Sequence, residues 1–178
     1  MSDGATSGAV VPRVVIVMGV CGSGKSTFGR LLAERRGGVF HDADDWHPGE
    51  NIAKMAAGQP LDDEDRAPWL ARMRREVVDA ASNEGLTVLA CSALKRAYRV
   101  ALGVGEDGVV LIHLAGSREL LAERLAGRAG HFMKPGMLES QLATLEVPGP
   151  EEGLTLDVER RLEDLLEAAD RWLGVAGG

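Results

Sequence analysis

Residues 14–28 read VVIVMGVCGSGKSTF, and this stretch decides the fold of the chain. Its first five residues are all apolar and most are β-branched, a pattern typical of a short strand that is buried on both faces. A glycine-rich segment follows and leads into a predicted helix over residues 25–36, which Gly37 and Gly38 end. Residues 19–26 match the pattern G-x-x-x-x-G-K-[ST], after a strand and at the start of a helix as that pattern requires. The sequence therefore predicts a loop that binds the phosphates of a nucleotide.

The residues of this loop have predicted roles at ATP and Mg²⁺. Successive backbone N–H groups of such a loop point into one concavity, and the helix N-terminus adds positive potential. We expect Lys25 to reach the terminal phosphates, Ser26 to be a ligand of Mg²⁺ and Thr27 to donate to a nearer phosphate. Near a helix N-terminus, Cys21 is either a reactive thiolate or a small filler. The predicted ATP-binding residues of the loop are Gly19, Val20, Cys21, Gly22, Ser23, Gly24, Lys25, Ser26 and Thr27.

Strand and helix patterns alternate along the rest of the chain. Further strands are predicted over residues 39–41, 86–91, 109–114 and 154–158, and further helices over residues 50–57, 65–82, 93–102, 118–128, 137–146 and 159–173. We expect Asp65 to cap the third of these helices, with Pro68 in its first turn. This alternation predicts an α/β protein, a five-stranded parallel sheet with helices on both faces. Ligands of such sheets bind beyond the carboxyl ends of the strands.

Composition argues for one globular domain and against several kinds of partner. The 178 residues are 45% hydrophobic and 26% charged, as in ordinary globular proteins. The net charge of −7, with no long basic block, argues against nucleic acid as a partner. The apolar run at residues 14–20 is too short to span a membrane, and the first nine residues lack the features of a secretory signal. Two cysteines are too few for a disulfide scaffold, which favours a reducing, cytoplasmic location.

Two carboxylates stand at the end of the second predicted strand. We expect the two side chains to point to opposite sides, so that Asp42 faces the metal while Asp44 faces an acceptor hydroxyl. The alternative is an acidic loop that is simply solvated. No predicted strand ends in an apolar run followed by Asp, the common second nucleotide motif. An aspartate from strand two would then hold the metal, an arrangement similar to that of shikimate kinase-like enzymes.

Two arginines end the predicted helix over residues 118–128. Arg124 and Arg128 are followed by a small loop that contains Gly130, His131 and Lys134. This arrangement resembles the lid of nucleoside monophosphate kinases, which implies that one arginine packs on the adenine and the other contacts the transferring phosphate. The alternative is a pair of solvated arginines one helical turn apart. We expect residues 1–12 to be a disordered leader and residues 13–174 to form a single P-loop kinase domain, with a lid around residues 124–136.

A more specific resemblance runs from about residue 14 to residue 148. The stretches HDADDWHP (41–48), GQPLDDEDRAPWL (58–70), CSALK (91–95) and GHFM (130–133) resemble the gluconokinase family. So do Asn51, Lys54, Met55, Tyr98, Arg99, Gln141, Thr144, Leu145, Glu146 and Pro148. Cys21 stands where Ser is expected and Ala43 where Gly is common. The resemblance implies the P-loop kinase fold of nucleoside monophosphate and shikimate kinases, and it suggests a homodimer.

The resemblance also implies a reaction, the transfer of the γ-phosphoryl group of ATP to the 6-hydroxyl of D-gluconate. The implied catalytic residues are Lys25, Asp44 and Arg128, with Arg124 beside them at ATP and with Ser26 and Asp42 at Mg²⁺. Asp44 would deprotonate the acceptor hydroxyl, and Arg66 would bind the sugar acid's carboxylate. The implied substrate-binding residues are Asp44, His47, Lys54, Arg66, Ser92, Lys95 and His131. For His47 and Trp69, packing in the pocket wall is the alternative.

Other functions stay open at this point. A kinase of the same fold could act on shikimate, a nucleoside monophosphate or another small hydroxylated acid. A nucleotide-dependent regulatory module could use the same loop with no acceptor at all. Asp44, Arg66 and the two arginines of the lid argue against the regulatory module, because such a module needs no second pocket.

Overall fold

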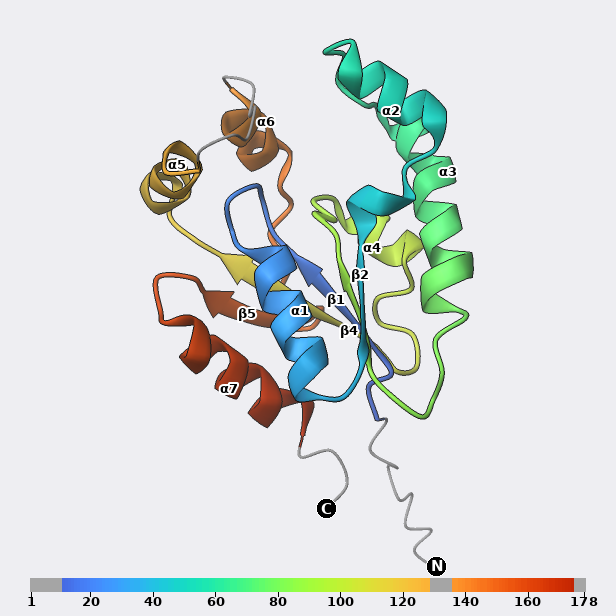
Figure 1. Ribbon diagram of the computed structural model, residues 1–178, viewed down its shortest axis with the longest axis vertical. Coiled ribbons are helices and arrows are strands. Elements are labelled where there is room, and N and C mark those ends of the chain that lie inside the picture. Colours follow the sequence, from blue (N-terminus) through green and yellow to red (C-terminus); the bar gives the residue numbers. More distant parts are fainter. Residues whose placement is uncertain (1–10, 129–135, 175–178) are drawn as a thin grey trace, which may run out of the picture.

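The computed structural model describes residues 11–128 and 136–174, which contain one five-stranded parallel sheet (Figure 1). Its strands are β1 (Val14–Met18), β2 (Val39–Asp42), β3 (Thr87–Ala90), β4 (Val109–Ala115) and β5 (Gly153–Asp157). Their order across the sheet is β2-β3-β1-β4-β5, and every neighbouring pair is parallel. The predicted five-stranded parallel sheet is therefore confirmed. Of the predicted leader, residues 1–10 lie outside the described residues.

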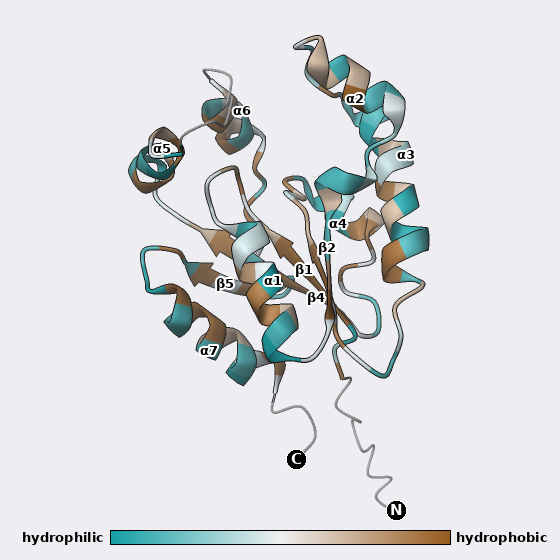
Figure 2. Ribbon diagram, in the orientation of Figure 1, coloured by the Kyte–Doolittle hydropathy of each residue, from teal (hydrophilic) through white to brown (hydrophobic). Residues whose placement is uncertain are grey.

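Helices cover both faces of the sheet, as predicted (Figure 1). They are α1 (Lys25–Arg35), α2 (Gly49–Ala56), α3 (Asp63–Met73), α4 (Arg96–Ala101), α5 (Arg118–Ala126), α6 (Met137–Thr144) and α7 (Leu162–Leu173). On one face Val15 and Val17 pack in a core with Phe28 of α1 and Leu165 of α7. On the other face Ile16 packs in a core with residues of α3 and α4. Figure 2 shows β1, β4 and β5 mostly in apolar brown, while the helices around them carry both brown and teal residues.

Strand β1 lies at the centre of the sheet and carries the phosphate loop at its carboxyl end. All five of its side chains are fully buried, two on one face of the sheet and three on the other. Complete burial of an aliphatic side chain contributes roughly 1.5–3 kcal/mol. The uninterrupted apolar run therefore holds the strand, and with it the start of the loop, in one place.

Helix α3 begins earlier than predicted and has a different cap. Asp62 is the N-cap: its side chain accepts from the Asp65 N–H, while the Asp65 side chain accepts from the Asp62 N–H. The prediction that Asp65 caps this helix is therefore wrong, because two acidic residues three apart form a reciprocal capping box that adds three residues to the helix. Pro68 consequently lies inside the helix rather than in its first turn. The helix continues as a single π-helical turn at Arg74–Val78.

The segment after β3 is a turn where a helix was predicted. Helix α4 begins at Arg96 rather than at residue 93, because Ala93 has a left-handed backbone with φ of 45°. The buried Arg99 guanidinium donates to the carbonyl oxygens of Ala93 (3.0 Å) and Leu94 (3.2 Å). Glu152 pairs with the same guanidinium at 3.0 Å. Tertiary hydrogen bonds thus replace the helical ones and fix the turn between β3 and α4.

In the described part of the chain, no helix is both long and apolar enough to cross a bilayer. The longest of them, α7, has 12 residues and an exposed polar side. A span would need about 20 predominantly apolar residues.

Candidate active site

The phosphate loop lies between β1 and α1, where the sequence pattern places it (Figure 1). Gly22 and Gly24 adopt left-handed backbones with φ of 83° and 87°, which other residues rarely adopt. Gly19 is needed for another reason: a Cβ there would lie 2.9 Å from the Leu114 carbonyl oxygen and 2.5 Å from the Ser23 hydroxyl. The loop can therefore curl tightly over the end of the sheet. Its curl is the geometry with which backbone N–H groups surround phosphate oxygens.

Two loop side chains are positioned for phosphate and metal chemistry. The Lys25 ammonium donates to the Val20 carbonyl at 3.3 Å, and burial lowers the pKa of this side chain. The Ser26 hydroxyl donates to the Asp42 carboxylate at 2.7 Å. Ser26 and Asp42 are the predicted Mg²⁺ ligands, and the fold brings them together from α1 and the end of β2. Thr27, the next residue of α1, is exposed.

A hydroxyl and a carboxylate are ligands that suit Mg²⁺. This ion keeps several waters and takes only one or two protein carboxylates plus phosphate oxygens. Among the described residues no group of three or more His, Cys, Asp or Glu side chains forms a metal cage. The Ser26–Asp42 pair therefore fits a nucleotide-bound Mg²⁺ rather than a metal held by the protein alone.

Cys21 is tied to helix α6 and does not have the environment of a thiolate. Its backbone N–H donates to the Gln141 side-chain oxygen at 2.7 Å. Burial raises the pKa of the Cys21 thiol, and this effect outweighs the opposing charges of Lys25 and Arg128. Of the two alternatives for Cys21, the raised pKa favours the small filler over the reactive thiolate. Gln141 emerges as a support of the loop that no local sequence pattern predicts.

The prediction that strand alternation separates the two aspartates is wrong, because residues two apart in a strand share a face and β2 ends at Asp42. Asp44 lies in a 3₁₀ turn (Ala43–Trp46), and its backbone N–H donates to the Asp42 carboxylate at 3.0 Å. Although the Asp44 side chain reaches solvent, desolvation by the surrounding protein and then the Asp42 charge raise its pKa. A carboxyl with a raised pKa is a better proton acceptor than an ordinary surface aspartate. The turn thus separates a metal-side carboxylate, Asp42, from a more basic one, Asp44.

A cavity of about 80 Å³ lies beside the loop, between α3, α4 and α6. It is lined by Arg66, Trp69, Leu70, Cys91, Ser92, Ala93, Leu94, Tyr98, Ser140, Gln141 and Thr144. Arg66 and Ser92 were predicted to bind substrate, and both contribute to this cavity. Gln141 contacts the phosphate loop and the cavity at once. The cavity is therefore joined to the phosphate loop through Gln141.

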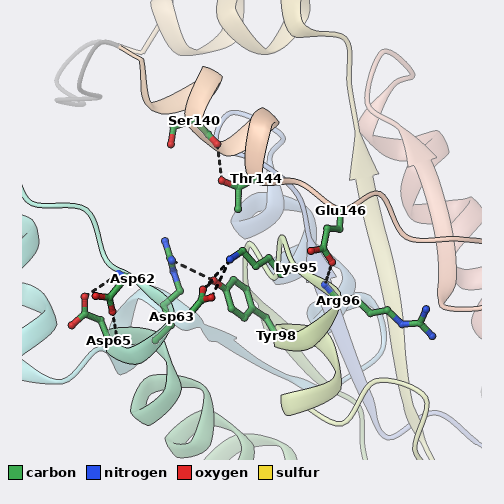
Figure 3. Close-up of polar contacts among 10 residues, drawn as sticks. Asp62, Asp63, Asp65, Lys95, Arg96, Tyr98, Ser140, Thr144 and Glu146 are labelled. Carbon is green, nitrogen blue, oxygen red and sulfur yellow. Dashed lines mark hydrogen bonds and ion pairs between the residues drawn. The ribbon is translucent and has the colours of Figure 1, made fainter.

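A network of polar side chains joins α3 to α4 at the edge of this cavity (Figure 3). Arg66 donates to the Tyr98 hydroxyl at 3.3 Å, with its guanidinium carbon 5.6 Å from the centre of the ring. The Tyr98 hydroxyl in turn donates to Asp63. Lys95 contacts both oxygens of the same carboxylate, at 3.0 and 3.2 Å. Arg66 and Lys95, two predicted substrate residues, are therefore neighbours in the fold.

Lys54 and His47 have structural contacts of their own. The Lys54 ammonium lies 2.5 Å from Asp65 and 3.9 Å from Asp62, so that it ties α2 to the capping box of α3. His47 stacks on Trp69, with ring centres 4.2 Å apart and planes at 14°. Burial lowers the pKa of His47, so the ring is neutral at pH 7. These contacts favour the pocket-wall interpretation of His47.

The lid is only partly described. Arg124 donates to the Val158 carbonyl at 2.7 Å, a contact with the protein's own backbone. Arg128 is exposed beyond the end of α5, and its charge acts on Cys21 of the phosphate loop. Residues 129–135, including the predicted substrate residue His131, lie outside the described residues. The roles of these three residues at ATP and substrate stay predictions.

Comparison with known proteins identifies close relatives. The family described as an AAA domain matches residues 15–142. A gluconokinase from Gluconobacter oxydans (strain 621H) is 47% identical over 155 residues, with 85% of each chain covered. A gluconokinase structure from Sinorhizobium meliloti 1021 has a TM-score of 0.80 at 42% identity, covering 92% of both chains. A sugar kinase from Janibacter sp. HTCC2649, solved without ligand, has a TM-score of 0.83 at 45% identity and covers 93% of this chain and 96% of its own.

Proposed function

The chain belongs to the gluconokinase family, and from this membership we propose that it transfers the γ-phosphoryl group of ATP to the 6-hydroxyl of D-gluconate. The products are ADP and 6-phosphogluconate. One observation carries the proposal on the structural side: Gln141 joins the phosphate loop to a cavity that Arg66 and Tyr98 line, and the Lys95 ammonium lies 5.6 Å from the centre of the Tyr98 ring. Two cations beside the cavity suit an anionic acceptor. A site for a neutral sugar would need neither.

On the nucleotide side, the chain supplies positive charge and backbone donors. Phosphoryl transfer passes through a loose transition state, so that positioning and charge neutralisation supply most of the rate enhancement. Lys25 neutralises the terminal phosphates, and Arg128 does so from the lid. Ser26 and Asp42, directly or through water, would hold Mg²⁺, which would neutralise further phosphate charge when bound. Arg124 is assigned to the adenine. To bind there it would release its hydrogen bond to the Val158 carbonyl or use another of its N–H groups.

On the acceptor side, Asp44 accepts the proton of the 6-hydroxyl as that oxygen bonds to phosphorus. The bond from phosphorus to the bridging oxygen of ADP breaks in the same transfer. The raised pKa of Asp44 suits this role. Arg66 and Lys95 bind the carboxylate at the other end of the sugar acid, while Ser92 contacts its hydroxyls. Lys54, His47 and His131 are assigned to the wall and rim of the same pocket.

Three broader features belong to the same proposal. Use of ATP with Mg²⁺ is supported by the kinase family and by the hydroxyl–carboxylate pair at the loop. A cytoplasmic location is supported by the two free cysteines, Cys21 and Cys91. Burial raises the pKa of Cys91 to about 12, so this thiol stays protonated and unreactive. The homodimer rests on the family resemblance alone and stays a prediction.

An ADP-release assay with three acceptors tests the proposal. We expect turnover with D-gluconate and at most traces with shikimate or AMP. Robust turnover with shikimate or AMP but not with gluconate would assign the site to another kinase reaction. ATP hydrolysis that no acceptor stimulates would favour the regulatory module instead.

A further inference from the structure

Asp63 has no role in the transfer as proposed, yet its carboxylate is held by Lys95 and Tyr98, two residues at the proposed acceptor site. It is the first residue of α3, and Figure 3 shows Lys95 and Tyr98 pointing toward it from the β3–α4 turn and α4. The Lys95 ammonium contacts both carboxylate oxygens, and the Tyr98 hydroxyl donates to one of them. Arg66 donates to the same hydroxyl from the other side. A carboxylate of the chain therefore sits among three donors suited to a carboxylate ligand.

We propose that Asp63 is a stand-in for the substrate carboxylate and a specificity-determining residue of the acceptor site. This inference rests on the function proposed above. In the chain without substrate, Asp63 occupies the donors of Lys95 and Tyr98. Gluconate binds by displacing it, so that its own carboxylate takes these donors together with those of Arg66.

The Tyr98 hydroxyl is held in place by packing, whereas the Asp63 carboxylate that accepts its hydrogen bond is free to move away. Tyr98 is only 8% exposed and packs in the core with Trp69 and Leu70, so its hydroxyl keeps its position. The Asp63 side chain is 65% exposed, and no core contact holds it. When it turns outward it stays in the first turn of α3, where the helix dipole stabilises a negative charge. Hydrogen bonds from Tyr98 and then Lys95 lower the pKa of Asp63, so it competes as an anion at neutral pH.

The stand-in explains how the site rejects neutral sugars. The hydroxyl of a neutral polyol is a weaker acceptor than a carboxylate for charged donors, so it displaces Asp63 poorly. An anionic acceptor exchanges one carboxylate for another and leaves every donor satisfied. Removal of the competitor therefore strengthens gluconate binding, by up to about fivefold if Asp63 holds its place as exposed ion pairs do.

The test compares Asp63→Asn with Glu64→Gln. Both changes remove one negative charge from the first turn of α3, and Glu64 is exposed and makes no ion pair or hydrogen bond through its side chain within the described residues. For Asp63→Asn we expect the KM for gluconate, and its Kd measured by calorimetry, to fall about fivefold. The kcat and the KM for ATP should match those of Glu64→Gln.

A second variant is expected to change the KM for gluconate in the opposite direction. Tyr98→Phe removes a donor that the substrate carboxylate uses, so its KM for gluconate should rise. If Asp63→Asn raises the KM, or leaves it equal to that of Glu64→Gln, Asp63 is no stand-in but a positioning residue or a surface ion pair. A wild-type protein inactive on gluconate would instead refute the proposed function, and that measurement is made before either variant is compared.

Discussion

Replacement of Arg66 by lysine tests acid recognition most directly. The guanidinium lines the cavity, and one of its nitrogens donates to Tyr98 at 3.3 Å. The alternative to acid recognition is a purely structural pairing of Arg66 with Asp62, Asp63 or Asp65, but within the described residues Arg66 forms no ion pair with any of them. Its other donors are therefore available for a carboxylate.

The expected loss follows from the geometry of the two side chains. Lysine keeps the charge but cannot form two parallel hydrogen bonds to one carboxylate, and it cannot stack on Tyr98 in the same way. A hydrogen bond to a charged group contributes about 1.5–3 kcal/mol, so Arg66→Lys should lower kcat/KM for gluconate by about 10- to 150-fold. The ADP-release assay measures this value, with sorbitol as a poor, neutral substrate of similar length. Losses of equal size on gluconate and sorbitol would refute acid recognition and leave Arg66 as part of the scaffold.

Three further predictions concern the catalytic groups and the turn after β3. Lys25→Ala should lower turnover by at least about 100-fold with cooperative unfolding kept, since the ammonium contacts only the Val20 carbonyl among the described residues; wild-type rates would remove Lys25 from the site. Asp44→Asn should lower kcat about 100-fold or more. Because the pKa of Asp44 is raised, the kcat/KM of the wild type should fall with decreasing pH, around a pKa above the ordinary 3.8. This fall at acidic pH should be absent from the pH profile of the variant; if the fall is unchanged, another group accepts the proton. Glu152→Gln should reduce the free energy of unfolding by on the order of 3 kcal/mol in thermal denaturation, because the buried Arg99 loses its counter-charge. The pKa of Glu152 is lowered, so its stabilisation is present above pH ~4.5 and is lost as the pH falls through the lowered pKa; equal stability of variant and wild type at pH 7 would contradict this role.

Much of the fold follows from short-range patterns. The apolar run of β1 predicts a fully buried strand, and all five residues are fully buried. The glycine-lysine-serine pattern predicts a phosphate loop, which the structure places between β1 and α1. The error at Asp65 has the same origin: Asp62 and Asp65 are both good caps, and only the reciprocal hydrogen bonds show which one begins the helix.

The candidate site was predicted as a set of residue types rather than as a geometry. Ser26 and Asp42 were expected to share a metal, and they are hydrogen-bonded. Strand alternation does not describe Asp44, because β2 ends two residues earlier. Tyr98, Asp63 and Gln141 had no predicted roles, since no pattern of neighbouring residues distinguishes them.

The order of strands and helices along the chain, the phosphate loop and the family can be predicted from the amino-acid sequence. These properties depend on short stretches of residues, whose periodicity and turn chemistry act locally. The contact of Gln141 with a loop 120 residues away, and the position of Asp63 facing Lys95 and Tyr98, become visible in the folded chain alone. Contacts of this kind depend on where crossovers deliver α3, α4 and α6 around the end of one sheet. Desolvation is likewise a property of the assembled fold: it raises the pKa of the Cys21 thiol and of the Asp44 carboxyl, an effect that their neighbours in the chain do not predict.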